Sequence, residues 1–154
     1  MKTTDQQLRH GNSAMGIHFL KIAAIYLAIG VSMGLYMGIT QSFKLHPVHA
    51  HINLLGWASM ALFGVIYVQF PAAAETTLAR IHFWMHNLAL PVFMVALTFL
   101  LSGHAEMALA VEIAATVTGV GIALFVINLC LNVRIPVRTK VPVERGVPSW
   151  PAVQ

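Results

Sequence analysis

Long apolar runs alternate with short polar connections along the chain. A helix needs about 20 apolar residues to span the hydrocarbon core of a bilayer. Four runs reach that length, over residues 17–40, 48–70, 81–102 and 105–131. The connections QSFKLHP, PAAAETTLAR and SGH are short, so neighbouring helices are expected to run antiparallel. The pattern predicts an all-α fold, an integral-membrane antiparallel bundle of four transmembrane helices.

The sequence divides into one transmembrane domain and a tail. Residues 1–133 contain the four apolar runs, and residues 134–154 (RIPVRTKVPVERGVPSWPAVQ) are rich in proline, which predicts an extended or disordered tail. The first run is too long for the hydrophobic region of a secretory signal, and no cleavage site follows it. It is therefore expected to remain in the protein as a transmembrane helix.

The basic residues predict the orientation of the bundle. Lys44 lies at one end of the predicted helices, and all other basic residues lie at the opposite end: Lys2, Arg9, Lys21, Arg80, Arg134, Arg138, Lys140 and Arg145. Regions rich in Lys and Arg next to transmembrane helices stay in the cytoplasm. Both termini are therefore predicted to be cytoplasmic.

The composition agrees with a membrane protein. The chain is 58% hydrophobic and 9% charged, whereas soluble domains have about 25% charged residues. The net charge of +4 comes from basic residues at the ends of apolar runs, so we interpret it as a topology signal and not as a nucleic-acid surface. Cys130 is the single cysteine, which excludes a disulfide within one chain and favours an inert thiol.

Three glycines recur at four-residue spacing in the first apolar run, at Gly30, Gly34 and Gly38. Small residues with this period line one face of a helix and allow close approach of a second helix. The second helix belongs either to the same chain or to another subunit.

The histidines fall into two groups by predicted depth. His46, His49 and His51 open the second helix on the periplasmic side, with His104 in the loop on the same side. The second group, predicted near the cytoplasmic side, consists of His18, His82 and His86. At ~1.5 Å per residue, the helix from His51 to Phe70 is nearly 30 Å long. One chain is therefore not expected to bring His51 and His86 to the same metal.

Helical spacing separates the candidate ligands further. His46 and His49 share a face at i, i+3, whereas His51 is about 200° around the helix from His49. His49 and His51 are thus expected to face different pockets, or a pocket and a neighbouring subunit. His82 and His86 form an i, i+4 pair, which is able to chelate a metal; the alternative is that His82 is an interfacial residue.

Polar residues within the predicted helices are further candidates. Glu112 lies about two turns into the fourth helix, near the predicted depth of His51, and ionisable groups at membrane depth are functional candidates. It is either a proton carrier, a hydrogen-bond partner that orients an imidazole, or a protonated structural carboxyl. Asn53 and Asn128 are explained by hydrogen bonds between helices.

The stretch HAHINLLGWASMALFGVIYVQFP, residues 49–71, resembles the second transmembrane helix of the catalytic subunit of haem-copper oxidases, and especially of nitric oxide reductases. In that family a histidine in an H-x-N context ligates the low-spin haem, and His51 and Asn53 match those positions. The next segment, beginning LARIHFWMHN, resembles the family's third helix. The likeness covers roughly residues 44–102 and extends to small cytochrome-oxidase-like proteins of bacteria. It implies haem b, with its iron, and the bacterial inner membrane.

The chain also departs from that family. The catalytic subunit has twelve helices in three equivalent arcs, and nothing here resembles its copper-site helix or its cross-linked tyrosine. A monomer is therefore not expected to be a complete oxygen reductase. The HAH of His49 to His51 combines features of the family's helices two and ten. This implies a homotrimer, with haem held between His51 of one protomer and His49 of the next, and a homodimer is the alternative.

Three functions follow as hypotheses. The first is a multi-pass haem b protein that acts in electron transfer or binds a diatomic gas, nitric oxide or oxygen. The second is copper or zinc binding or transport, with a periplasmic mouth of His46, His49, His51 and His104 beside Met60 or Met107, and an inner site of His82 and His86. The third is an accessory or assembly subunit without a cofactor. In each case the lipid bilayer is a partner.

Overall fold

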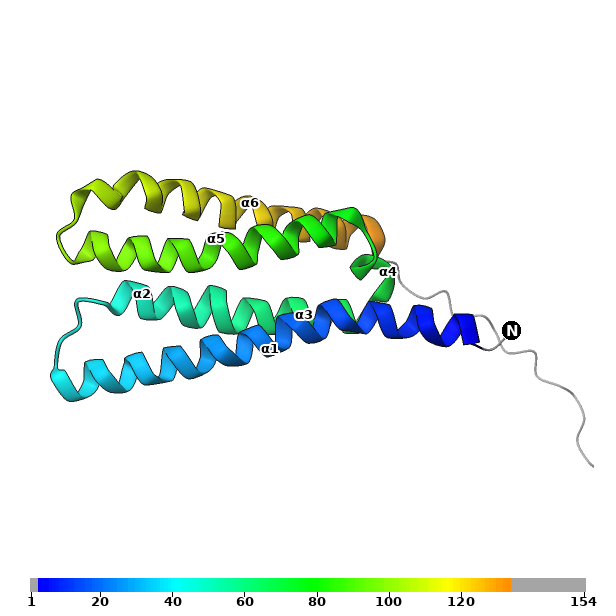
Figure 1. The fold of residues 1–154 in the computed structure, drawn as a ribbon, viewed down its shortest axis with the longest axis horizontal. Coiled ribbons are helices and arrows are strands. Elements are labelled where there is room, and N and C mark those ends of the chain that lie inside the picture. The colour runs from blue at the N-terminus through cyan, green and yellow to red at the C-terminus, as the bar shows by residue number, and fades with distance from the viewer. Residues whose placement is uncertain (1–2, 134–154) are drawn as a thin grey trace, which may run out of the picture.

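The computed structural model describes residues 3–133, with side chains described from Ala14 onward. The predicted tail, 134–154, lies outside the described residues. The described chain is almost entirely helical (Figure 1). Its elements are α1 (Thr3–Thr40), α2 (His46–His51), the π-helical η1 (Ile52–Ser59), α3 (Met60–Gln69), α4 (Pro71–Ala74), α5 (Thr77–Leu101), the 3₁₀ turn η2 (Ala105–Met107) and α6 (Ala108–Asn132).

The elements form two antiparallel helical hairpins that lie side by side (Figure 1). In the first hairpin α1 packs along η1 and α3, and in the second α5 packs along α6. The short helix α4 connects the hairpins and touches α1, α3, α5 and α6. The N-terminal end of α1 lies at the same end of the bundle as α4 and the end of α6 (Figure 1).

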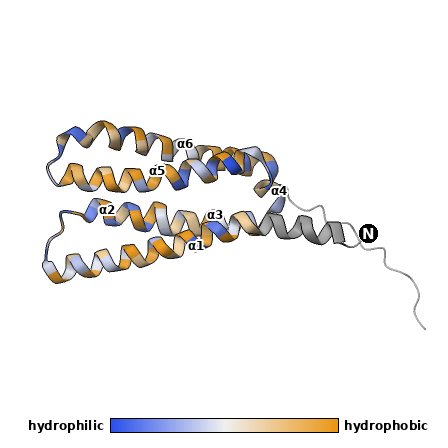
Figure 2. Cartoon of the chain, in the orientation of Figure 1, coloured by the Kyte–Doolittle hydropathy of each residue, from blue (hydrophilic) through white to orange (hydrophobic). Residues whose placement is uncertain are grey.

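Four helices are long and apolar enough to cross a membrane: Ala14–Thr40, His46–Gln69, Thr77–Leu101 and Ala105–Asn132. The predicted all-helical fold with four such helices is therefore confirmed. Apolar residues dominate each of them (Figure 2), and large apolar side chains lie on the outer surface, including Leu54, Leu88 and Leu109, each more than 60% exposed. An apolar outer surface is typical of helices in contact with lipid.

The helix boundaries differ from the predicted ones at two places. α1 is helical from Thr3 although its apolar part starts at Ala14. α5 starts at Thr77 and not at residue 81, because the Thr76 side chain accepts a hydrogen bond from the backbone N–H of Ala79 at 3.0 Å and caps the helix. A polar capping residue inside a predicted loop explains this shift.

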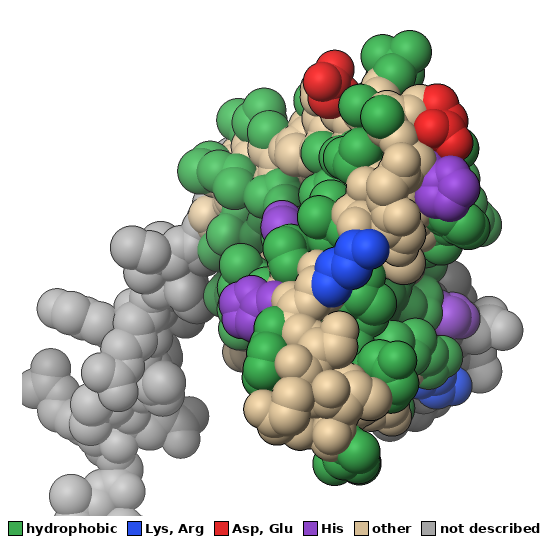
Figure 3. Space-filling model, turned by 90° about the vertical axis from the view of Figure 1, so that its left-hand side faces the viewer, with side chains coloured by type: hydrophobic (Ala, Val, Ile, Leu, Met, Phe, Trp, Pro, Cys, Tyr) green, Lys and Arg blue, Asp and Glu red, His purple; other side chains and the backbone are tan. Residues whose placement is uncertain are grey.

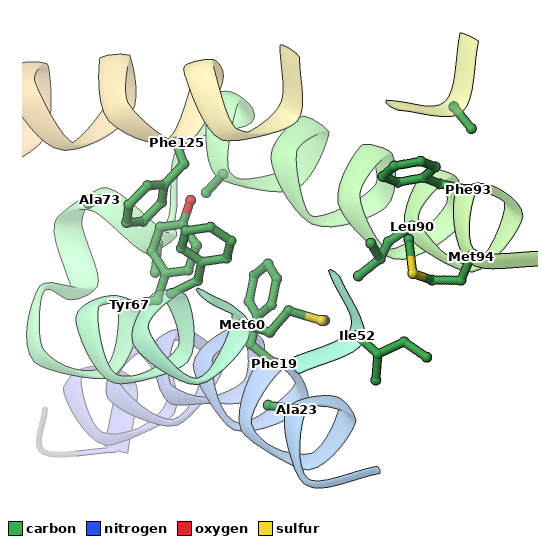
Figure 4. Close-up of a cluster of buried hydrophobic side chains, with 14 of the residues drawn as sticks. Phe19, Ala23, Ile52, Met60, Tyr67, Ala73, Leu90, Phe93, Met94 and Phe125 are labelled. Carbon is green, nitrogen blue, oxygen red and sulfur yellow. The ribbon is translucent and has the colours of Figure 1, made fainter. Parts of the chain in front are cut away.

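Aromatic side chains from both hairpins fill the core (Figure 4). Phe19 from α1, Tyr67 from α3 and Phe125 from α6 lie together, with ring centroids 5.8 Å apart for Phe19 and Tyr67 and 5.6 Å apart for Tyr67 and Phe125. Such pairs prefer edge-to-face or offset contacts at these distances. The two hairpins are therefore joined largely by side chains. Within the first hairpin, α1 and α3 approach each other closely at Gly16 and Gly64, where an added Cβ would meet the backbone of the other helix.

A buried polar cluster fixes the α4 end of the bundle. The Asn128 side chain is fully buried and donates to the carbonyl oxygen of Ala73 at 2.9 Å. Its Oδ1 accepts hydrogen bonds from the Thr76 hydroxyl at 2.8 Å and from the Asn132 amide at 2.9 Å. The predicted role of Asn128 in hydrogen bonding between helices is confirmed.

Candidate functional site

The three histidines of α2, which begins the second candidate membrane span, lie at the end of the bundle opposite α4. Pro47 occupies the first turn of α2, where its missing N–H leaves no hydrogen bond unmade. His46 is exposed at the start of the helix, and its ring centroid is 6.5 Å from that of His49. Figure 3 views this end and shows histidine, acidic and basic side chains among apolar ones.

His51 is oriented by the backbone of its own helix. Its Nδ1 lies 2.7 Å from the carbonyl oxygen of Pro47. Because a carbonyl oxygen only accepts, the ring donates from Nδ1, and in the neutral imidazole this places the lone pair on Nε2. The ring is half-buried and meets the edge of Phe93 from α5 at a centroid distance of 5.1 Å. His51 therefore presents a free, oriented nitrogen on the side of α2 that faces α5.

His49 lies on the opposite side of α2, against α1. A Cβ added at Gly34 would come within 3.0 Å of the His49 Cε1 atom, and one at Gly30 would collide with the Asn53 side chain. The Asn53 amide donates to the His49 carbonyl oxygen at 2.8 Å and lies beside the ring, 3.3 Å from its Nδ1. Gly30 and Gly34 therefore pack within one chain, making room for Asn53 and His49. Gly38 has no atom within 4 Å of an added Cβ.

A π-helical stretch follows His51 directly. η1 has eight residues, Ile52–Ser59, in a helix type that is rare and frequently marks functional sites. Within it the carbonyl oxygen of Leu55 accepts a hydrogen bond from His86 Nε2 at 3.2 Å. The apolar pattern of residues 48–70 gives no signal for this change of helix type, so sequence reasoning missed it.

His82 and His86 lie in the core of the bundle, each 0% exposed. The ring of His86 reaches the carbonyl oxygen of Leu55, one turn beyond His51, so His86 lies closer to the His51 end of the bundle than expected. The His82 ring is enclosed by Phe19, Phe63 and Phe125 and therefore lies inside the bundle and not on its outer surface. The Nδ1 atom of His82 shares a hydrogen bond with the Tyr67 hydroxyl at 3.1 Å. Both rings are buried because α5 packs against α6 in its own hairpin and against α2 and η1 of the first hairpin.

Glu112 and His104 lie on the surface. Glu112 is exposed on the outer face of α6, and no hydrogen bond within residues 14–133 joins it to an imidazole. His104 pairs with Glu106 at 3.0 Å, with both side chains more than half exposed, and exposed pairs of this kind contribute little to stability. The free Cys130 is exposed as well.

The described part of the chain brings few potential metal-binding side chains together. Among residues 14–133, no group of three or more His, Cys, Asp and Glu side chains is arranged to hold a metal ion. The predicted periplasmic mouth of four histidines is therefore not formed within one chain. His49 and His51 point to opposite sides of α2, and His104 is engaged by Glu106.

Comparisons of the chain with protein-family models, with curated proteins and with solved structures found no match. Its function must therefore be inferred from the geometry of its own side chains.

Proposed function

We propose that the protein binds haem b in a membrane, with His51 as an axial ligand, and acts in electron transfer or in binding a diatomic gas. The observation that carries the proposal is that the half-buried His51 ring lies against Phe93 of α5 while its Nδ1 donates to the Pro47 carbonyl oxygen at 2.7 Å. Histidines that ligate metals typically donate their other ring N–H to an oxygen, which fixes the tautomer and the direction of the ligating nitrogen.

The donor set at His51 fits haem iron. The His51 Nε2 has no hydrogen-bond partner among the described residues, and the aromatic ring of Phe93 lies beside it. The sequence contains no C-x-x-C-H motif, so the haem would be held without covalent attachment. Bound haem would supply an iron centre whose ligand number decides between electron transfer and gas binding; the chain supplies the axial nitrogen and its orientation.

The positions of His49 and His51 support a homo-oligomer. The two half-buried rings lie on opposite sides of α2, so one chain offers its histidines to two different places. A cyclic trimer, with haem between His51 of one protomer and His49 of the next, uses both; a dimer is the alternative. The mass of the haem-loaded protein in detergent tests this, and a haem-loaded monomer with two axial histidines would contradict it.

The charges support an orientation with both termini cytoplasmic, in the bacterial inner membrane. Lys44 is exposed in the loop before α2, whereas Lys21 and Arg80 are exposed toward the opposite end of the bundle. Four further basic residues follow α6 in the sequence. The positive-inside rule assigns the side rich in basic residues to the cytoplasm.

The reduced-minus-oxidised absorption spectrum of the purified protein tests the proposal. Haem b ligated by histidine gives a sharp Soret band and a sharp α band on reduction, and carbon monoxide added to the reduced protein shifts the Soret band if one axial position is open. The protein is expressed in haem-sufficient cells and then incubated with haemin. If its spectrum still shows no haem bands, the proposal is contradicted.

A further inference from the structure

Two buried imidazole nitrogens on α5 have no hydrogen-bond partner within residues 14–133. They are Nε2 of His82 and Nδ1 of His86, and both side chains are 0% exposed. Buried polar atoms are nearly always paired with protein, water or an ion, so each unpaired atom requires an explanation. Neither atom is used by the site at His51.

The hydrogen bonds on the other side of each ring allow lone pairs on both of these nitrogens. The carbonyl oxygen of Leu55 forces His86 to donate from Nε2, so its Nδ1 is an acceptor. When His82 donates from Nδ1 to the Tyr67 oxygen, its Nε2 is an acceptor too. Each ring then has an oxygen partner on one nitrogen, Nδ1 of His82 and Nε2 of His86, and a lone pair on the other. This arrangement is found in metal-ligating histidines.

The surroundings are apolar and aromatic, so they would tolerate a monovalent ion better than a divalent one. The rings of Phe63, Phe19 and Phe125 lie 4.7, 5.2 and 5.3 Å from that of His82, centroid to centroid, and aromatic faces attract cations. The buried polar side chains of the described chain are His82, His86, Thr118 and Asn128, without a carboxylate. A divalent ion here would be poorly compensated in an apolar interior.

The number and spacing of the available ligands further restrict which metal ion could bind. Zinc takes four ligands in structural sites, and no third metal-binding side chain joins the pair within residues 14–133. The His82 and His86 ring centroids are 5.8 Å apart, which is compatible with one ion between two nitrogens at about 2 Å each. We propose that His82 and His86 form a buried two-coordinate site for a monovalent copper ion. This proposal is independent of haem binding at His51.

Copper retention tests the site. Protein from copper-supplemented cells is purified under reducing conditions, treated with a Cu(I) chelator and analysed for copper. One copper per chain is expected to survive, because the fully buried rings protect it from the chelator. His86→Leu and His82→Gln are each expected to reduce retained copper at least tenfold. The matched control His104→Ala, which removes an exposed histidine, is expected to retain it fully.

X-ray absorption spectroscopy of the copper-loaded unmutated protein tests the site even if a variant misfolds, because it reports the copper ligands directly. The expected spectrum is that of Cu(I) with two nitrogen ligands. Absence of chelator-resistant copper, a four-coordinate spectrum, or loss of copper in His104→Ala would each overturn the proposal. Haem content measured on the same samples separates the two sites, since His51→Ala is expected to lose haem and keep copper.

Discussion

His49 and His51 are two residues apart but have different chemical surroundings. Pro47, four residues before His51, offers its carbonyl oxygen to the His51 ring at 2.7 Å. The His49 ring instead rests on a glycine of α1, beside the Asn53 amide. Since side chains two positions apart point about 200° apart on a helix, only His51 faces α5, and its Nε2 is the nitrogen left free for a ligand.

Gly34 is predicted to be required for the position of His49. In Gly34→Leu the new side chain would overlap the His49 ring, and the free energy of unfolding is expected to fall by about 1–3 kcal/mol, as is typical of overpacking. The matched control is Gly38→Leu, because nothing lies within 4 Å of an added Cβ there. Thermal unfolding in detergent measures both variants, and equal midpoints for the two would contradict this packing.

At the scale of elements, the π-helical segment η1 links the two histidine sites. It begins directly after His51 and contains Leu55, whose carbonyl oxygen orients His86 on α5. A regular α-helix pairs each backbone carbonyl with the N–H four residues later, whereas π-helical turns change this pairing and recur at functional positions. The segment therefore places a backbone acceptor in the interior of the bundle.

Asn128 is predicted to stabilise the junction of α6 with α4. Asn128→Leu removes one hydrogen bond each from the Ala73 carbonyl oxygen, the Thr76 hydroxyl and the Asn132 amide. Each hydrogen bond contributes about 0.5–1.5 kcal/mol net, so the free energy of unfolding is expected to fall by about 1–3 kcal/mol. Thr116→Ala, on the exposed face of α6, is the control and should change the free energy little. An unchanged midpoint for Asn128→Leu would show that the cluster adds nothing.

At the scale of the whole molecule, the two ends of the bundle differ in charge and chemistry. The histidines of α2 lie at one end, and the N-terminal side of α1, α4 and the end of α6 lie at the other (Figure 1). If the latter end is cytoplasmic, the proposed haem ligand lies near the periplasmic surface, where a soluble redox partner is able to approach it.

Cysteine labelling tests this orientation. In a Cys130→Ser background, Ser42→Cys and Glu75→Cys place thiols at exposed positions at the two ends without changing a basic residue. A membrane-impermeant maleimide is expected to label Ser42→Cys in intact spheroplasts and Glu75→Cys only after the membrane is disrupted. The reverse pattern would place the termini outside the cytoplasm.

The fold was largely predictable from the sequence, because apolar runs of membrane-spanning length determine helices directly. The separation of His49 and His51 also follows from helical spacing. The depth of His86 in the bundle could not be predicted in this way. It depends on the position of α5 along η1, which the local sequence pattern does not encode. The π-helical turn and the Thr76 cap likewise arise from tertiary contacts and from a single polar residue within a loop.

Haem content of His51→Ala, measured against His18→Ala, tests the central claim most directly. The control is closely matched, because His18 also hydrogen-bonds through Nδ1 to a carbonyl four residues earlier, that of Ala14, but lies toward the opposite end of the bundle. The proposal predicts that His51→Ala lowers haem per chain by about tenfold or more, by loss of an axial ligand, and that His18→Ala retains it. Full haem content in His51→Ala would contradict the assignment of His51 as the ligand.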